Sequence, residues 1–267
     1  EITHAMVVPT MLARILEVLE DGKGLPTLRH LSYGGGRMPL PIIERAMELI
    51  PNVNFVNAYG LTETSSSISI LGPDDHRDAM ASEDPAIRKR LGSVGRPLPS
   101  VEITIRDEDG KEVPTGTSGE VWVRGEQVSG EYAKQGSTSS DEGWFQTKDG
   151  GYFDDGGFLF VEGRIDDVIV KGGENLSPGE IEDVLLDHPS VREVCVVGLP
   201  DVEWGEIVAA VIVPAEGTKC DDDELKQWVA KHLRSSRVPA LFEYRIELPY
   251  NDTGKVLRRV IREELKK

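Results

Sequence analysis

The sequence predicts a mixed fold: the end of a parallel α/β part, then a barrel-like antiparallel β part, then a small α+β domain. Three observations predict it. Apolar strands alternate with amphipathic helices over residues 1–72, and alternating apolar and polar side chains mark strands within 96–162. After Gly163 and Arg164, helices and strands mix again. We therefore expect a large domain at 1–165 and a small one at 166–267.

The first part is expected to contain strands at 5–9, 28–33 and 54–58, with helices at 10–20 and 39–49 between them. This alternation predicts parallel strands, and ligands of such sheets bind beyond the carboxyl ends of the strands. Two segments follow strand ends. They are the glycines at 34–36 and the segment 59–64, which reads Tyr-Gly-Leu-Thr-Glu-Thr.

The middle of the chain is expected to be less regular. Residues 73–95 are polar and read as a loop that contains a short helix at 85–91. Strands at 101–106 and 119–124 flank an Asp-Gly turn signal at 109–110. Residues 148–151 read as a tight turn, and 158–161 as a strand.

The last part begins with a strand expected at 167–170. A helix follows, opened by a capping box from Ser177 to Glu180 with proline at its first position. Further strands are expected at 194–199, 207–214 and 244–246. Helices are expected at 221–234 and from 256 onward, the latter basic.

Composition and charge argue against several classes of function. The chain has 267 residues, 30 basic and 47 acidic, and a formal charge of −17, which argues against a general nucleic-acid or anionic-membrane binder. The apolar run at 207–213 is too short to cross a bilayer. Cys195 and Cys220 form no disulfide framework, so a reducing, cytoplasmic setting is expected. The chain begins at Glu1 without a leader pattern, and we expect a piece of a longer protein without a signal peptide.

Three groups of residues could bind a nucleotide. Glycine backbone at 34–36 and hydroxyls at 59–64 can approach a phosphate, Tyr59 can cover a base, and Glu63 can ligate Mg²⁺. Local chemistry alone favours another reading of that segment, in which Thr62 or Thr64 caps a helix. Asp149 and Arg164 could hold ribose hydroxyls, although an Asx-turn and a surface arginine are the simpler reading.

The third group is the lysine after a flexible glycine. Lys255 could reach phosphate oxygens, and its alternative is a solvated lysine beside a helix start. Gly172 and Gly173 could admit a ligand, but an ordinary turn is the better reading of that pair. The five histidines are scattered without metal-ligand spacing.

Five ordered matches, with the hinge and its following loop taken as one, together resemble the adenylate-forming acyl/aryl-CoA synthetase superfamily. Its core motif resembles 57–64, and its hinge and following loop resemble 163–167 and 171–175. Segments 95–97, 147–152 and 248–255 fall in the family's order. The resemblance covers nearly the whole chain and is closest to fatty-acid–CoA ligases, because Gly172, Gly173 and Glu174 differ from peptide-synthetase patterns.

The resemblance implies a two-step ligase reaction. ATP and a carboxylic acid give acyl-AMP and pyrophosphate, and CoA then displaces AMP. The residues expected to be catalytic are Lys255, Thr62 and Glu63, with Glu63 also the Mg²⁺ ligand. The family's nucleotide and CoA contacts fall on Gly34, Gly35, Gly36 and Tyr59 for adenine, Thr62 for the α-phosphate, Asp149 and Arg164 for ribose, and Gly172 and Gly173 for the pantetheine path; Gly60 is a further expected nucleotide-binding residue. Asp166 is the expected hinge.

Two departures qualify the expected function. The family's Thr-Gly-Asp is Thr147-Lys148-Asp149 here, which leaves the turn geometry open, and the family's phosphate loop has no counterpart in the chain. We therefore expect the carboxyl-terminal part of a fatty- or aryl-acid–CoA ligase, inactive or very weak alone. The expected partners are a carboxylic acid, ATP and CoA, but no nucleic acid. The strand at 5–9 should expose a sheet edge that a second copy or the missing amino-terminal half would cover.

Two alternatives stay open. The first is an adenylating enzyme that loads a carrier protein. The second is a non-catalytic nucleotide-binding or interaction module.

Overall fold

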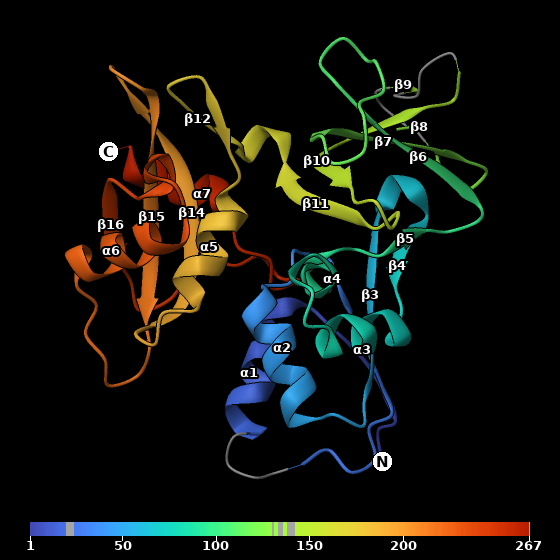
Figure 1. The fold of residues 1–267 in the computed structure, drawn as a ribbon, viewed down its shortest axis with the longest axis horizontal. Helices are drawn as coiled ribbons and strands as arrows, with labels where there is room; N and C mark the ends of the chain where they lie inside the picture. Colours follow the sequence, from blue (N-terminus) through green and yellow to red (C-terminus); the bar gives the residue numbers. More distant parts are fainter. Residues whose placement is uncertain (20–23, 130, 133–135, 138–141, 267) are drawn as a thin grey trace. The chain divides into compact units, whose positions relative to one another are not determined.

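The chain, drawn as a ribbon in Figure 1, forms two compact units, Glu1–Ile165 and Asp166–Lys267. Each unit has its own apolar core. The computed structural model describes residues 1–19, 24–129, 131–132, 136–137 and 142–266. Within these residues, no helix is both long and apolar enough to cross a membrane.

A five-stranded sheet begins the first unit. Its order is β1-β2-β3-β4-β5, with β1 to β3 parallel and β4 and β5 antiparallel. Its strands are β1 His4–Val7, β2 His30–Gly34, β3 Asn54–Leu61, β4 Ser66–Leu71 and β5 Arg96–Pro97. Helix α1, Pro9–Leu19, and helix α2, Leu40–Leu49, connect the parallel strands. The predicted α/β start is confirmed.

Helical spacing explains how these helices attach. Leu12, Leu16 and Leu19 lie one turn apart on α1 and are buried, as is Ile43 on α2. They share one apolar cluster with Leu31 of β2 and other strand residues. The cluster fixes the strand ends at which the candidate residues stand.

Helix α3, Pro73–Ala81, was not predicted, because the segment is polar. Its start nevertheless carries a sequence signal. Pro73 occupies the first turn, and the Asp75 carboxylate accepts a hydrogen bond from the Gly72 N–H at 3.2 Å. The expected helix at 85–91 is the short α4, Pro85–Arg88, followed by a 3₁₀ turn, Lys89–Gly92.

The second sheet of this unit is antiparallel, as predicted. Its order is β11-β10-β7-β6, and in the residues described it stays open and does not close into a barrel. Its strands are β6 Val101–Arg106, β7 Gly119–Gly125, β10 Phe145–Phe153 and β11 Leu159–Arg164; the pair β8 Glu131–Tyr132 and β9 Gly136–Ser137 lies apart. The predicted tight turn at 148–151 was wrong, since these residues form an irregular stretch inside β10.

The second unit is built on one sheet, ordered β13-β12-β15-β14 with β16 paired to β15. Its strands are β12 Ile169–Lys171, β13 Glu174–Leu176, β14 Val191–Asp201, β15 Gly205–Pro214 and β16 Leu241–Tyr244, and its helices are α5 Pro178–Leu186, α6 Asp222–His232 and α7 Arg258–Leu265. Alternate residues of β14 and β15 enter two clusters, one with α5 and α6 and one with α7. Burial on both faces explains the continuous apolar run at 207–213.

The capping box predicted for α5 is absent. Pro178 does occupy the first turn, but the Ser177 side chain makes no capping hydrogen bond. The Glu180 carboxylate instead lies 3.2 Å from the guanidinium of Arg237. The Glu180 carboxylate, which the capping box would need, thus forms an ion pair with Arg237 instead.

Candidate functional site

The end of strand β3 brings Tyr59 toward the second sheet. Its hydroxyl donates a hydrogen bond to Asp149 Oδ2 at 2.6 Å, although the two residues are 90 positions apart. The next residue must be glycine, because a Cβ at Gly60 would lie 1.8 Å from the carbonyl oxygen of Ser66. The close return of β4 over Gly60 therefore shapes the strand end that carries Tyr59.

Asp149 lies in β10 directly opposite Arg164 of β11. Arg164 Nη1 is 3.3 Å from Asp149 Oδ1 and donates to the Thr147 carbonyl at 2.9 Å. Lys148 between Thr147 and Asp149 has φ +64°, the left-handed conformation that glycine adopts without strain. Lys148 thus lies within strand β10 rather than in a turn, and its backbone has a conformation that a glycine would also adopt.

Tyr59, Asp149 and Arg164 form the central cluster of the candidate site. Asp149 is buried, while the Arg164 side chain is 45% exposed. Burial, followed by the nearby charge of Asp149, raises the pKa of Tyr59 well above its usual range, so this phenol remains a donor at neutral pH. A carboxylate held by a hydroxyl and a guanidinium can accept further hydrogen bonds from a vicinal diol.

The three glycines at 34–36 lie at the end of strand β2, which pairs with β3. Gly34 pairs with Ala58 of β3, and a Cβ at Gly34 would lie 2.5 Å from the Ala58 carbonyl oxygen. Gly35 has φ +77°. Close packing of two backbones is therefore one reason for glycine at Gly34, and the turn at Gly35 is another. Gly36 follows, with no atom closer than 3.9 Å to a Cβ placed there.

The segment after Tyr59 forms a 3₁₀ turn, Thr62–Thr64. Thr64 is buried, and its hydroxyl accepts from the Leu61 N–H at 2.9 Å, so Thr64 is the capping threonine. Thr62 is exposed and Glu63 is half-buried. The described part of the chain holds no group of three or more potential metal ligands. Glu63 fits Mg²⁺ only as a single carboxylate that shares the ion with phosphate oxygens, a usual arrangement for this metal.

The second unit holds the remaining predicted residues. Gly172 and Gly173 form the two-residue turn between β12 and β13, with φ +60° and +82°. Lys255 is exposed in a loop, and its N–H donates to the Asn251 side-chain oxygen at 2.9 Å. Asp166, the expected hinge, lies in a 3₁₀ turn, Ile165–Asp167, at the start of this unit.

Thr147 was not predicted as a site residue. It is buried, its hydroxyl donates to the Val121 carbonyl at 2.7 Å, and the same oxygen accepts from the Asp149 N–H at 3.1 Å. Thr147 thus fixes the backbone on which Asp149 stands. Its place two residues before Asp149, on the same face of a strand, was the available sequence signal.

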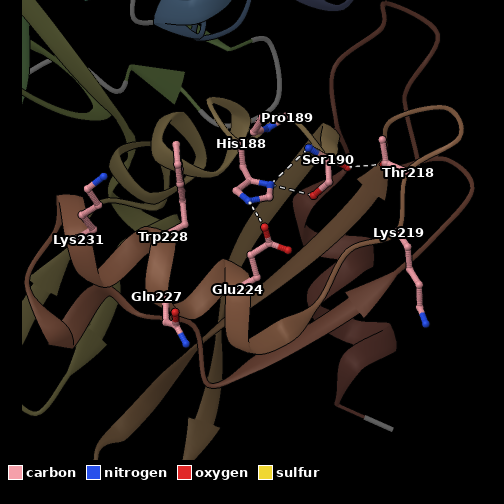
Figure 2. A pocket seen from close by; sticks show the side chains of 9 residues that line it. All are labelled: His188, Pro189, Ser190, Thr218, Lys219, Glu224, Gln227, Trp228 and Lys231. Atoms are coloured by element: carbon pink, nitrogen blue, oxygen red, sulfur yellow. Dashed lines mark hydrogen bonds and ion pairs between the residues drawn. The ribbon is translucent and has the colours of Figure 1, made fainter.

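A separate pocket of about 520 Å³ lies in the second unit, between the end of α5 and helix α6 (Figure 2). None of the predicted site residues lines it. Its centre is the buried His188, whose Nδ1 lies 2.8 Å from Ser190 Oγ and whose Nε2 lies 3.5 Å from Glu224 Oε1. The His188 ring also meets Trp228 edge-on at 5.1 Å, so these contacts join α5 to α6.

Comparisons with known proteins identify the family of the chain. AMP-binding enzymes match residues 1–133, and the C-terminal domain of AMP-binding enzymes matches 180–255. The chain belongs to the adenylate-forming superfamily. The chain matches the carboxyl-terminal part of the proteins in that family. The mixed α/β architecture of the two units is also that of the family's subdomains.

Several family members are similar over almost the whole chain. A 2-succinylbenzoate–CoA ligase from Bacillus licheniformis is 38% identical over 97% of this chain and 51% of its own length. A fatty acid–[acyl-carrier-protein] ligase from Streptomyces coeruleorubidus is 37% identical over 98% of this chain and 50% of its own. The chain spans about half the length of the curated relatives it matches.

Two solved structures have the same fold. The o-succinylbenzoate CoA synthetase from Bacillus subtilis, solved with an acyl-adenylate intermediate, matches with a TM-score of 0.81 and 35% identity, over all of this chain and 51% of that one. An amide bond synthetase from Marinactinospora thermotolerans matches with a TM-score of 0.87 and 34% identity, over 98% of this chain and 52% of that one.

Proposed function

We propose that this chain supplies the carboxyl-terminal part of an ATP-dependent carboxylate–CoA ligase. A carboxylate oxygen attacks the α-phosphorus of ATP, and the bond to pyrophosphate breaks. The CoA thiol then loses its proton, attacks the acyl carbonyl and displaces AMP. The observation that carries the proposal is the contact of Tyr59, Asp149 and Arg164, drawn from three strands of a family member.

The resemblance to the family suggests the roles of residues in the first unit, and the contact of Tyr59 with Asp149 supports them. The Asp149 carboxylate and the Arg164 guanidinium bind the ribose hydroxyls, and Tyr59 with the glycines Gly34, Gly35 and Gly36 borders adenine. Thr62, exposed at the turn, contacts the α-phosphate. Glu63 holds Mg²⁺, which neutralises phosphate charge when bound. Positioning and charge neutralisation, rather than covalent catalysis by the protein, account for the rate.

The second unit supplies the mobile groups. The Lys255 ammonium bridges the carboxylate and the phosphate during adenylation and offsets the repulsion of two anions. The turn at Gly172 and Gly173 lines the pantetheine path in the second step. Rotation about Asp166 exchanges the two, as in other hinge-type rearrangements.

The proposed substrate is an aryl or fatty acid. Support comes from similar proteins of both kinds, a 2-succinylbenzoate ligase at 38% identity and a fatty-acid ligase at 37%. The second of these loads an acyl-carrier protein, which keeps a carrier-protein acceptor as the alternative to free CoA. A nucleotide-binding module without catalysis is the alternative for the 267-residue chain alone, which we propose to be inactive or very weak in adenylation.

Two measurements test the proposal. Titration of this chain with AMP, followed by ligand-observed NMR, should show binding that Asp149→Ala weakens about tenfold or more. The longer protein that contains the chain should release AMP from ATP in the presence of CoA and 2-succinylbenzoate or a fatty acid, and Lys255→Ala should abolish acyl-AMP formation. AMP binding by the chain together with an unaffected Lys255→Ala protein would exclude the assigned role of Lys255. Absence of AMP binding would exclude the nucleotide site itself.

A further inference from the structure

Tyr59 does more than border a nucleobase. Its ring packs against two apolar clusters, one containing Ile68 and Val123 and the other Val121 and Leu159. These contacts hold the ring in place, so its hydroxyl is directed at a defined point. That point is Asp149 Oδ2, 2.6 Å away.

The two oxygens of the Asp149 carboxylate face different donors. Oδ2 accepts from the Tyr59 hydroxyl, and Oδ1 faces Arg164 Nη1 at 3.3 Å. Two donors on different oxygens fix the rotation of a carboxylate about its last side-chain bond, where the energy profile is otherwise broad. A hydrogen bond from a hydroxyl to a carboxylate at this distance belongs to the strong, charge-assisted class.

We propose that the Tyr59 hydroxyl is a positioning group that sets the plane of the Asp149 carboxylate for recognition of a ribose diol. The inference rests on the proposed function, in which Asp149 binds ribose, and adds a determinant of the preference for ribonucleotides. Both ribose hydroxyls can then donate to one carboxylate held at a fixed angle. A carboxylate free to rotate would lose much of the discrimination that a preorganised acceptor gives.

The test compares AMP with 2′-deoxy-AMP and 3′-deoxy-AMP on the 267-residue chain, by ligand-observed NMR titration. The unaltered chain should bind AMP about tenfold more tightly than either deoxynucleotide, the usual effect of one hydrogen bond to a charged group. Tyr59→Phe keeps the ring and removes the hydroxyl, and should lower this preference to about threefold or less. A preference that stays near tenfold in Tyr59→Phe would overturn the proposal.

A double-mutant cycle shows whether Tyr59 acts through Asp149. In an Asp149→Asn background, adding Tyr59→Phe should leave the remaining preference unchanged, because the group that Tyr59 orients is already altered. A further equal loss in that background would mean that Tyr59 contacts the ribose independently, which contradicts the positioning role. Tyr152→Phe is the matched control. It removes a hydroxyl from the same strand as Asp149, where the ring stacks on Phe160, and should keep the full preference.

A 3-fluorotyrosine at position 59 gives a second measurement if Tyr59→Phe does not fold. Its ¹⁹F resonance should shift when AMP is added and shift less with the two deoxynucleotides. Equal shifts with all three ligands would overturn the positioning role while leaving nucleotide binding intact. Absence of any binding by the unaltered chain would instead overturn the proposed function, and the role of Tyr59 with it.

Discussion

Lys148 carries a backbone conformation that its side chain disfavours. Its φ of +64° is left-handed, and for a residue with a Cβ this costs about 1–2 kcal/mol. Lys148→Gly should therefore raise the free energy of unfolding by about 1 kcal/mol, reduced from the full strain by the extra entropy of glycine in the unfolded chain. Urea denaturation measures the gain. Lys148→Ala keeps the Cβ and should give no such gain; equal stabilisation by both variants would show that the lysine side chain, not its backbone, is the cause.

His76 is buried between α3 and the first sheet with both ring nitrogens occupied. Nδ1 lies 2.7 Å from the Gly72 carbonyl oxygen, which can only accept, so Nε2 accepts from the Tyr33 hydroxyl at 2.8 Å. The ring is neutral in this arrangement. Burial lowers the pKa of His76 to about 4, because a charged imidazole would lose its solvation.

The lowered pKa makes stability depend on pH. The unfolded chain takes up the proton near pH 6.5 and the folded chain only near pH 4, so the stabilising contribution is complete above pH 6.5 and is lost as pH falls toward 4. Between pH 7.5 and 5, the free energy of unfolding should fall by about 2 kcal/mol through this group. His76→Gln should be less stable at pH 7.5 but show a smaller fall over the same range. The same fall in both proteins would assign the pH dependence to other groups.

At the scale of elements, Arg258 links α7 to the rest of the second unit. Its guanidinium makes a bidentate contact with Glu182 of α5, with distances of 2.5 and 3.2 Å, and donates to the Val196 carbonyl of β14. Burial, the largest single effect, lowers the pKa of Arg258, but the charge of Glu182, its hydrogen bond and other nearby charges together raise it. Glu182 is itself largely buried and needs this partner.

Removing the guanidinium should therefore leave a buried carboxylate without its cation. Arg258→Met should lower the free energy of unfolding by about 3 kcal/mol, and adding Glu182→Gln should recover part of the loss, because a neutral amide needs no counter-charge. Arg259→Ala is the matched control, since the Arg259 side chain is 80% exposed and forms an ion pair with Glu263 on the same helix. Its effect should stay below about 0.5 kcal/mol in the same urea titration. Similar losses for the two arginines would contradict an anchoring role.

Burial explains which elements could be predicted from the sequence. Helix α1 and strand β6 show the periodicity of their buried side chains in the sequence, and strand β15 shows a continuous apolar run. Each was expected within a few residues of its place. Helix α3 is mostly polar, and the sequence shows its capping signals but no apolar stripe; for this reason the helix was not predicted. Strand β10 was mistaken for a turn because Gly150 and Gly151 look like turn residues, while here they allow the strand to shift register against its neighbours.

The candidate site could be predicted only by resemblance. Local chemistry favoured ordinary readings for Tyr59, Asp149 and Arg164, since each alone is a common surface or turn residue. Their contact depends on how two sheets pack, and Tyr59 and Asp149 are 90 residues apart. Spacing along the chain contains no information on such a contact. Conversely, local reasoning did predict a capping threonine, because the residues of that contact, Leu61 and Thr64, are only three positions apart.

At the scale of the whole molecule, the two units have separate cores. The apolar clusters of Asp166–Lys267 draw all their members from residues 169–265, and those of Glu1–Ile165 draw theirs from residues 5–161. A unit with its own core is expected to fold alone. The proposed rotation about Asp166 needs this independence, because a unit that borrowed its core from its neighbour could not move without exposing apolar side chains.

We therefore expect the small unit to fold by itself. Residues 166–267 expressed alone should unfold cooperatively in urea, and the fluorescence of Trp204 and Trp228 reports the transition. In the intact chain, replacing Trp122 and Trp144 of the other unit by phenylalanine lets the same two tryptophans report the unfolding of the small unit. The two midpoints should agree. A fragment beginning at residue 203 is the control, since it lacks β14, whose pairing with β15 runs from Val191 to Asp201, and should not fold. A small unit that unfolds without cooperativity would mean that its fold depends on the large unit, and the proposed rotation would then need another explanation.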